Sequence, residues 1–395
     1  MKKSIAIIGG GPSALFAAAF LDTNKFDVTI YEKKKSLGRK FLVAGDGGFN
    51  LSHGESIDNI IARYTPTSFL KNALLNFTNE DFRNWLLSID IPTFVGSSNR
   101  IYPEKGIKPI TVLTNIKQFL IDKNIQFVYN HEWKGWNDKS ELVFNDNKTI
   151  NADYTIFSLG GASWKITGSD GNWTDKFKQK DINTLPFLPA NCAYNINWKS
   201  DFISKNEGQP LKNMAVSCLD KKQKGELVIT KFGLEGNAIY ALSPQIQSQL
   251  SANIKPVIYL DLKPMFTFTE IVKKINNSHL RTTDILKKIL KLSAPQIALL
   301  KTVLTKEEYI NKNSIEEKIK ALPLVIEAAA PLNEAISTTG GIPLNEVNEN
   351  FELKKLKNNY CIGEMLDWNA PTGGYLLQAC FSMGAYVAKH FNEKE

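Results

Sequence analysis

A glycine-rich turn near the N-terminus constrains the fold of this chain more than any other feature of its sequence. Residues 9–14 read Gly-Gly-Gly-Pro-Ser-Ala and match GxGxxA, a variant of the GxGxxG pattern. An apolar, β-rich segment (residues 4–8) precedes the turn, and an alanine-rich segment (residues 12–21) that favours a helix begins within it. A second apolar strand is expected at residues 27–31, directly before Glu32. This order predicts a βαβ mononucleotide-binding unit.

Each position of this fingerprint has a physical reason. Gly9 permits the tight turn, Gly11 lets the backbone come close to a pyrophosphate, and Ala14 keeps the helix near the sheet. The N-terminus of the helix offers unpaired N–H groups and a partial positive charge to phosphates. Glu32 is placed to accept hydrogen bonds from ribose hydroxyls. We therefore expect cofactor-binding residues at Gly9, Gly11, Pro12, Ser13, Ala14 and Glu32.

A second glycine-to-helix junction lies near the C-terminus. A short strand at residues 360–362 precedes Gly363 and Glu364, and Gly373-Gly374-Tyr375 then enters an apolar helix expected to run to about residue 390. In two-dinucleotide-binding flavoproteins, such a carboxylate holds the ribityl chain and such a helix N-terminus stabilises negative charge on the reduced ring. A dehydrogenase that binds only NAD has no use for this element. The sequence therefore favours FAD over NAD.

The pattern of the chain changes in its middle. Another apolar strand at residues 154–159 ends at Gly160-Gly161, but short alternating strands follow from about residue 185 to residue 262. Apolar residues then recur at helical spacing, as at residues 285, 286, 289 and 290. We expect an α/β fold in which a Rossmann-type FAD domain is interrupted by two insertions. The expected bounds are 1–185 and 337–395 for the FAD domain, 186–264 and 322–336 for a β-barrel-like insert, and 265–321 for a helical insert.

Composition excludes several classes of protein. Of the 395 residues, 43% are apolar and 22% are charged, which is typical of a globular chain with substantial cores. The four cysteines form no CxxC pair, so a disulfide reductase with a local dithiol is excluded, and no spacing of histidines indicates a metal. No segment reaches the ~18–20 apolar residues that cross a bilayer, and glycines interrupt the N-terminal apolar run too early for a secretory signal. We expect a soluble, cytoplasmic protein.

Several long blocks carry a resemblance to a known family. They are GGGPSAL (9–15), GRKFLVAGDGGFNLSH (38–53), NRIYP (99–103), SLGGASWKITGSDGNW (158–173), FGLEGNAIYALS (232–243), STTGG (337–341) and GEMLDWNAPTGGYLLQACFSMG (363–384). In these blocks the chain resembles the BaiN-like, or YhiN-like, flavoproteins, which are often labelled aminoacetone-oxidase-family FAD-binding enzymes, and it is most similar to an uncharacterised subfamily. The resemblance implies a Rossmann-type FAD domain interrupted by a β-barrel domain and a small helical domain.

The resemblance implies further cofactor-binding positions. It implies that Arg39 and Lys40 lie near the FAD phosphates, and that Gly363, Glu364 and residues 373–375 lie at the ribityl chain and the ring. The remaining residues expected to bind the cofactor are Lys33, Gly47, Asn50, Gly160 and Gly161.

The chain departs from many relatives at one motif. Those relatives read GGGRCN where this chain has Gly-Asp-Gly-Gly-Phe-Asn at residues 45–50. Gly48 and Phe49 therefore stand where the arginine and the cysteine would be. Chemistry that depends on either side chain cannot be transferred, and the identity of the substrate does not transfer either.

Four residues are considered for a catalytic role, of which Arg100, Tyr102 and Trp164 are the expected catalytic residues. Arg100 and Tyr102 belong to a family block, and a cation near the flavin binds an anionic substrate or stabilises the reduced ring; the alternative is a structural arginine. Trp164 belongs to a loop after Gly160-Gly161, at the end of a strand where ligands enter α/β sheets; the alternative is a lid over the core. His53 is a possible proton donor, although a plain hydrogen-bonding role is favoured.

Three functions remain open at this stage. The favoured one is an FAD-dependent oxidoreductase that passes electrons from NAD(P)H, docking transiently because no second GxGxxG exists, to an unsaturated organic substrate. The second is an RNA-modifying reductase that converts uridine to dihydrouridine in ribosomal RNA, for which the charge of +8 and the lysine-bearing helical insert are suitable. The third is a non-catalytic FAD-binding redox sensor. A small-molecule substrate is favoured over RNA, and neither a membrane nor a metal partner is expected.

Overall fold

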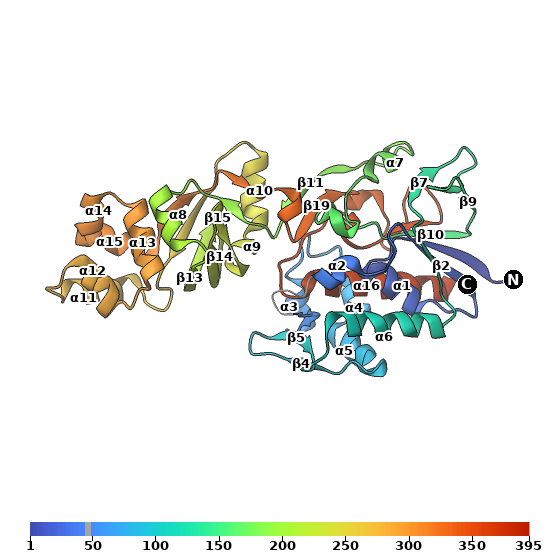
Figure 1. Ribbon diagram of the computed structural model, residues 1–395, viewed down its shortest axis with the longest axis horizontal. Helices are drawn as coiled ribbons and strands as arrows, with labels where there is room; N and C mark the ends of the chain where they lie inside the picture. Colours follow the sequence, from blue (N-terminus) through green and yellow to red (C-terminus); the bar gives the residue numbers. More distant parts are fainter. Residues whose placement is uncertain (44–48, 395) are drawn as a thin grey trace. The chain divides into compact units, whose positions relative to one another are not determined.

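The structure is a computed structural model that describes residues 1–43 and 49–394. The chain forms two compact units, shown in Figure 1. Unit 1 comprises Met1–Pro189 and Leu332–Glu395, and unit 2 comprises Ala190–Pro331. The first unit is thus built from two segments of the chain, with the second unit inserted between them.

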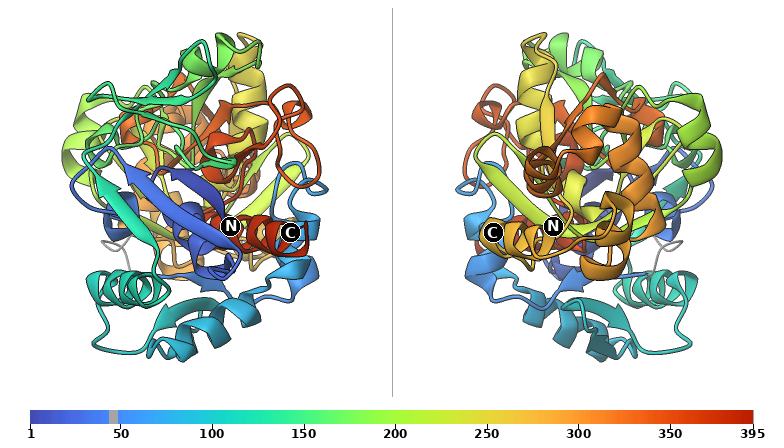
Figure 2. Two further views of the ribbon diagram at one scale, coloured as in Figure 1. Left: turned by 90° about the vertical axis from the view of Figure 1, so that its right-hand side faces the viewer. Right: turned by 90° about the vertical axis from the view of Figure 1, so that its left-hand side faces the viewer.

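A five-stranded parallel sheet forms the centre of unit 1. Its order is β20-β10-β1-β2-β6, so the N-terminal strand lies in the middle and the strand nearest the C-terminus lies at one edge. Figure 2 (left) shows β1 and β2, in blue, running side by side. Every residue of β10 is buried, as expected for a parallel strand covered on both faces. The bounds are β1 (Lys3–Ile8), β2 (Phe26–Glu32), β6 (Gln126–Tyr129), β10 (Tyr154–Phe157) and β20 (Asn359–Cys361).

Helices α1 (Pro12–Phe20) and α16 (Tyr375–Lys394) pack against each other beside this sheet. The run of alanines in α1 is fully buried, and the small side chains let the two helices approach closely. A Cβ on Gly384 of α16 would lie 2.5 Å from the Ser13 carbonyl oxygen of α1, so the contact requires a glycine there. α6 (Pro109–Asp122) also contacts α1.

Smaller elements of unit 1 surround this core. The other helices are α2 (Arg39–Val43), α3 (Ile57–Ile61), α4 (Lys71–Asn76), α5 (Asn79–Ser88) and α7 (Thr174–Lys178). One small sheet has the order β3-β5-β4, a second has the order β7-β8-β9, and β11 pairs with β19. Their bounds are β3 (Ser52–His53), β4 (Thr93–Val95), β5 (Arg100–Pro103), β7 (Trp133–Trp136), β8 (Leu142–Phe144), β9 (Thr149–Ile150), β11 (Leu185–Ala190) and β19 (Ser337–Gly341).

Unit 2 consists of a seven-stranded sheet and a group of helices. The strands follow the order β17-β16-β13-β14-β15-β12-β18, and each pair is antiparallel. They are β12 (Tyr194–Asn195), β13 (Pro210–Cys218), β14 (Lys221–Ile229), β15 (Gly233–Glu235), β16 (Val257–Asp261), β17 (Leu322–Val325) and β18 (Ala328–Ala329). The helices are α8 (Ser200–Asn206), α9 (Asn237–Tyr240), α10 (Ser243–Ser251), α11 (Phe268–Asn276), α12 (Thr282–Asp284), α13 (Ala294–Val303), α14 (Lys306–Ile310) and α15 (Lys312–Lys320).

One turn in unit 2 differs from the helix expected there. Residues 285–289 form a turn of π-helix rather than part of an α-helix. Ile285, Leu286 and Leu290 are nonetheless buried, so the apolar pattern correctly indicated which side chains face the core. The pattern identifies the buried side and does not distinguish a wider helical turn from a regular one.

Candidate functional site

The glycine turn after β1 is shaped as the fingerprint requires. Gly9 has a φ of +102°, and a Cβ there would lie 2.3 Å from the Ser158 carbonyl oxygen, so only glycine fits. Gly11 is different, because a Cβ on it would meet nothing within 4 Å and its φ is −83°. Gly11 is the N-cap of α1, which has no side-chain cap among the described residues. The N–H groups of the first helical turn therefore remain available to a ligand.

A cleft in unit 1 extends from this turn and encloses about 980 Å³ of empty space that is open to solvent. Most of the expected cofactor-binding residues line it: Gly9, Gly11, Pro12, Ser13, Glu32, Lys33, Arg39, Lys40, Gly160 and Glu364. Several lining residues had no signal in the sequence, because they come from segments without a motif: His131, Glu132, Trp133 and Lys176. The fold alone brings these four to the cleft.

Glu32 binds the backbone at the end of β2. Its Oε2 accepts the Gly10 N–H at 2.8 Å, and its Oε1 accepts the Lys34 N–H at 2.8 Å. Burial raises the pKa of Glu32, although these two N–H groups and the charges of Lys33 and Lys34 oppose the rise. A carboxylate oxygen has more than one acceptor position, so Glu32 remains able to accept hydrogen bonds from a ribose.

Glu364 is the corresponding carboxylate after β20. Its Oε2 pairs with Lys40 Nζ at 2.7 Å, and its Oε1 accepts the Thr338 N–H at 3.1 Å. Lys40 also donates to Ser163 Oγ at 2.7 Å. Arg39, its neighbour, donates from Nη2 to the Ile166 carbonyl at 3.3 Å, and its buried Nε has no partner among the described residues. An unsatisfied buried N–H beside the cleft suits an anionic ligand.

The sheet order places these two carboxylates on either side of the glycine turn. All the strands are parallel, so their carboxyl ends share one edge, where ligands of such sheets bind. Glu32 is the last residue of β2 and Glu364 follows β20, and these two strands lie three strand spacings apart, or about 14 Å. The turn after β1 lies between them. This arrangement fits a dinucleotide whose phosphates meet α1 and whose two sugar-like chains meet the two carboxylates.

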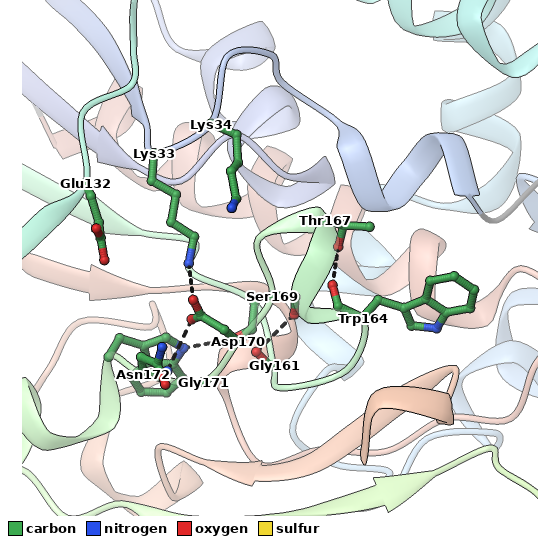
Figure 3. Close-up of polar contacts among 12 residues, drawn as sticks. Lys33, Lys34, Glu132, Gly161, Trp164, Thr167, Ser169, Asp170, Gly171 and Asn172 are labelled. Atoms are coloured by element: carbon green, nitrogen blue, oxygen red, sulfur yellow. Dashed lines mark hydrogen bonds and ion pairs between the residues drawn. The ribbon is translucent and has the colours of Figure 1, made fainter. Parts of the chain in front are cut away.

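The loop after β10 forms one wall of the cleft (Figure 3). Lys33 Nζ and the Asp170 carboxylate point toward each other and form an ion pair of 2.9 Å. Ser169 Oγ donates to the Gly161 carbonyl at 2.9 Å, which closes the loop on itself. The Trp164 ring extends away from the Lys33–Asp170 pair, and Trp164 is not among the residues that line the cleft.

Trp173, from the same loop, also lines the cleft; it is buried against Phe177 and donates from Nε1 to the Gly160 carbonyl at 3.0 Å. Several expected residues lie elsewhere in unit 1. Tyr102 stacks on the exposed Phe94 ring, with the two centroids 5.7 Å apart. Further residues that do not line the cleft are Ala14, Asn50, Gly161, Gly363 and the junction at 373–375. Gly45, Asp46, Gly47 and Gly48 lie outside the described residues.

The second glycine junction lies at the N-terminus of α16 and contacts β3. Gly374 has a φ of +99°, and a Cβ on it would lie 2.5 Å from the backbone of Ser52. Tyr375 stacks on the His53 ring, with centroids 4.9 Å apart. Arg100, which pairs with His53 across β5 and β3, has its Nε 3.6 Å from the Cβ position of Gly373. Two candidates from separate sequence blocks, His53 and Arg100, thus come together at this junction.

The described part of the chain gives two negative findings. Among residues 1–43 and 49–394, no helix combines the length and the apolar character that a membrane span requires. Within the same ranges, no group of three or more His, Cys, Asp or Glu side chains is arranged to hold a metal ion.

The chain is similar to known proteins over nearly its whole length. The family model described as HI0933-like protein Rossmann domain matches residues 3–390. A 3-dehydro-bile acid delta(4,6)-reductase of Clostridium scindens is 25% identical and covers 97% of each chain. A ribosomal RNA dihydrouridine synthase of Haemophilus influenzae is 22% identical and covers 95% of each chain.

A solved structure supports the fold. The open conformation of a flavocytochrome c3 fumarate reductase superimposes with a TM-score of 0.51 at 12% identity, covering 98% of this chain and 78% of that one. The expected fold class, a Rossmann-type FAD-binding fold, is therefore confirmed. The chain belongs to the HI0933-like Rossmann family, and it is a flavoprotein.

Proposed function

We propose that this chain is an FAD-dependent oxidoreductase that passes electrons from NAD(P)H to an unsaturated organic substrate. One observation supports it above all: a single cleft is lined by both the glycine turn after β1 and the carboxylate after β20. A cofactor with phosphates in its middle and a sugar-like chain on either side matches that arrangement. The similarity to a reductase over 97% of each chain supports an enzyme rather than a sensor.

The chain's own residues bind and orient the cofactor. When bound, FAD supplies a centre that accepts and donates a hydride. The N–H groups of α1 and the unpartnered Nε of Arg39 bind the phosphates. Glu32 holds the adenosine ribose and Glu364 the ribityl chain, while the ion pair with Lys40 keeps the Glu364 carboxylate in place.

Arg100 is the residue proposed to meet the substrate. Its guanidinium lies beside Gly373 and has no carboxylate partner among the described residues. Such a cation binds a carboxylate or a carbonyl oxygen and stabilises charge that develops on it. Tyr102 lies on the same face of β5 as Arg100, but its ring packs on Phe94, so we give it a subsidiary role in catalysis. Trp164 does not line the cleft and is given a subsidiary role as well.

The purified protein provides the test. We expect a two-banded flavin spectrum, release of FAD on denaturation, and loss of the yellow colour when NADH or NADPH is added without oxygen. A colourless protein that takes up no added FAD would refute the cofactor. A yellow protein that keeps its colour with both NADH and NADPH would refute NAD(P)H as the electron donor, but it would not refute FAD as the cofactor.

A second candidate is reduction of uridine in ribosomal RNA. Two relatives, from Haemophilus influenzae and Escherichia coli, are ribosomal RNA dihydrouridine synthases at 22% and 23% identity. Lys273, Lys287 and Lys291 of the helical part of unit 2 are exposed and suit phosphate binding. RNA binding that weakens steeply with salt, and loss of a ribosomal dihydrouridine in a deletion strain, would favour this candidate. Unchanged dihydrouridine in that strain would exclude it.

A further inference from the structure

A group of charged and aromatic side chains surrounds the N-terminus of α16. We call it the α16 cluster, and it consists of His53, Glu55, Arg63, Arg100 and Tyr375. None of these residues lines the cleft at the glycine turn, so the cluster is a separate feature of unit 1. Its position beside Gly373 and Gly374 places it at the end of the site proposed for the flavin ring.

Glu55 and Arg63 neutralise each other within the cluster. Arg63 Nε donates to Glu55 Oε2 at 3.1 Å, and Arg63 Nη2 makes a second, closer bond to Oε1. Burial is the largest single influence and raises the pKa of Glu55. The hydrogen bond and charge of Arg63, together with smaller contributions that include a hydrogen bond from Tyr375, outweigh burial, so the pKa of Glu55 lies below its usual range. The pair is therefore ionised near neutral pH, and its net charge is zero.

His53 contributes no charge to the cluster. Its Nδ1 accepts the Glu55 backbone N–H at 3.3 Å, and its ring also hydrogen-bonds the Ser98 carbonyl. A ring nitrogen that accepts a hydrogen bond carries no proton, so the imidazole is neutral. These contacts and the stacking on Tyr375 support the plain hydrogen-bonding role for His53.

The aromatic ring of Tyr375 links the Glu55–Arg63 pair to the Gly373-Gly374 junction at the N-terminus of α16. Tyr375 is the first residue of α16 and is buried against His53, with Arg63 5.9 Å from its ring centroid. Its backbone carbonyl accepts the hydroxyl of the buried Tyr64 at 2.7 Å. Glu55 and Arg63 are thus held at a fixed place relative to Gly373 and Gly374. Arg100 remains as a cation without a carboxylate partner among the described residues.

We infer that Glu55 is a positioning residue that cancels the charge of Arg63, so that Arg100 alone sets the positive charge at the flavin end of the site. The inference rests on the proposed function. A cation near a redox cofactor stabilises its more negative, reduced form and so raises its midpoint potential. Glu55 keeps that effect to one guanidinium instead of two.

Opposite potential shifts in two variants test the inference. In FAD-loaded protein, Glu55→Gln leaves the positive charge of Arg63 without its carboxylate partner and should raise the flavin midpoint potential. Arg100→Gln removes a positive charge and should lower that potential. We expect each change to alter the oxidised-to-reduced ratio about tenfold, or about 30 mV for a two-electron couple. The potential is measured against a reference dye in an anaerobic spectral titration, and no substrate is required.

The double variant Glu55→Gln/Arg63→Gln is the matched control, because it removes both charges of a neutral pair. Its potential should return toward that of the unaltered protein, whereas a merely structural role would leave it at least as disturbed as the single variants. If the midpoint potentials of FAD-loaded Glu55→Gln and Arg100→Gln do not change, or change in the same direction, the inference is overturned but the proposed function is not. An unaltered protein that binds no FAD would overturn the proposed function and the inference with it.

Discussion

Gly9 and Gly11 lie in the same turn after β1, but glycine is required at the two positions for different physical reasons. Gly9 is required by the chain itself, because its φ is +102° and a Cβ would collide with Ser158. Gly11 has an ordinary φ of −83° and open space beside it, so the folded chain alone would accept alanine there. We propose that the requirement at Gly11 comes from the cofactor, whose phosphates would approach the backbone at that point.

This difference predicts opposite behaviour for two alanine substitutions. Gly11→Ala should leave the FAD-free protein as stable or more stable by about 0.4–1 kcal/mol, while weakening FAD binding at least tenfold. Gly9→Ala should destabilise the FAD-free protein by about 1–3 kcal/mol through backbone strain, and the collision of its Cβ with Ser158 adds to this loss. Urea unfolding without FAD and fluorescence titration with FAD measure the two effects. Full FAD affinity in Gly11→Ala would contradict the close approach of the phosphates.

The buried imidazole of His53 predicts a pH dependence of stability. Burial lowers the pKa of His53 from its ordinary value of 6.5, and Arg63 and Arg100 lower it further against the opposing charge of Glu55. The unfolded chain therefore binds a proton first as the pH falls, so stability is lost as pH decreases from about 6.5 toward the lower folded-state pKa. We expect the urea midpoint to fall more in the unaltered protein than in His53→Gln between about pH 7.5 and pH 5.5. An equal fall of the urea midpoint in both proteins would disprove the contribution of His53 to this pH dependence.

At the scale of elements, one ion pair connects β2 to the loop that follows β10. Lys33 and Asp170 are partly buried, with side chains 26% and 22% exposed, and both line the cleft. The ordered loop forms a wall that FAD would contact, so breaking the pair should loosen that wall. The Lys40–Glu364 pair connects α2 to the residues after β20 in the same way.

Asp170→Asn should therefore raise the dissociation constant of FAD modestly. A partly exposed pair contributes about 0.2–1 kcal/mol, which corresponds to at most about a fivefold change. Asp175→Asn is the control, since its pair with Lys178 is exposed on both sides and lies outside the cleft lining. Equilibrium titration of the FAD-free proteins gives both constants. An equal effect of the two substitutions would show that the loop does not depend on Lys33.

At the scale of the whole molecule, every residue that lines the cleft belongs to unit 1. Unit 2 has its own antiparallel sheet and its own buried side chains. We therefore expect a chain in which a flexible Gly/Ser linker replaces residues 190–331 to fold and to retain the FAD spectrum. Size-exclusion chromatography and bound-FAD absorbance check this expectation. A linker variant that is folded but colourless would mean that unit 2 contributes to cofactor binding.

Local patterns in the sequence determined the FAD-binding part of the fold. The expected strands at residues 4–8 and 27–31 and the helix from residue 12 match β1, β2 and α1 within one or two residues. This succeeded because a strand–turn–helix–strand unit is encoded by short-range periodicity and by glycines whose backbone requirements are local. The boundaries were less accurate, since the strand expected to reach residue 159 ends at Phe157.

Only the tertiary structure decided which side chains meet. Tyr64 binds the backbone of Tyr375 across 311 positions of the chain, and Glu55 selects Arg63 rather than Arg100 as its partner. No periodicity encodes such pairs, because they depend on how β3, β5 and the N-terminus of α16 pack together. The sequence alone predicted a flavin dinucleotide as the cofactor, because the glycine turn and the strands around it are local patterns. The packing of β3, β5 and α16 decided where the charges at the N-terminus of α16 lie.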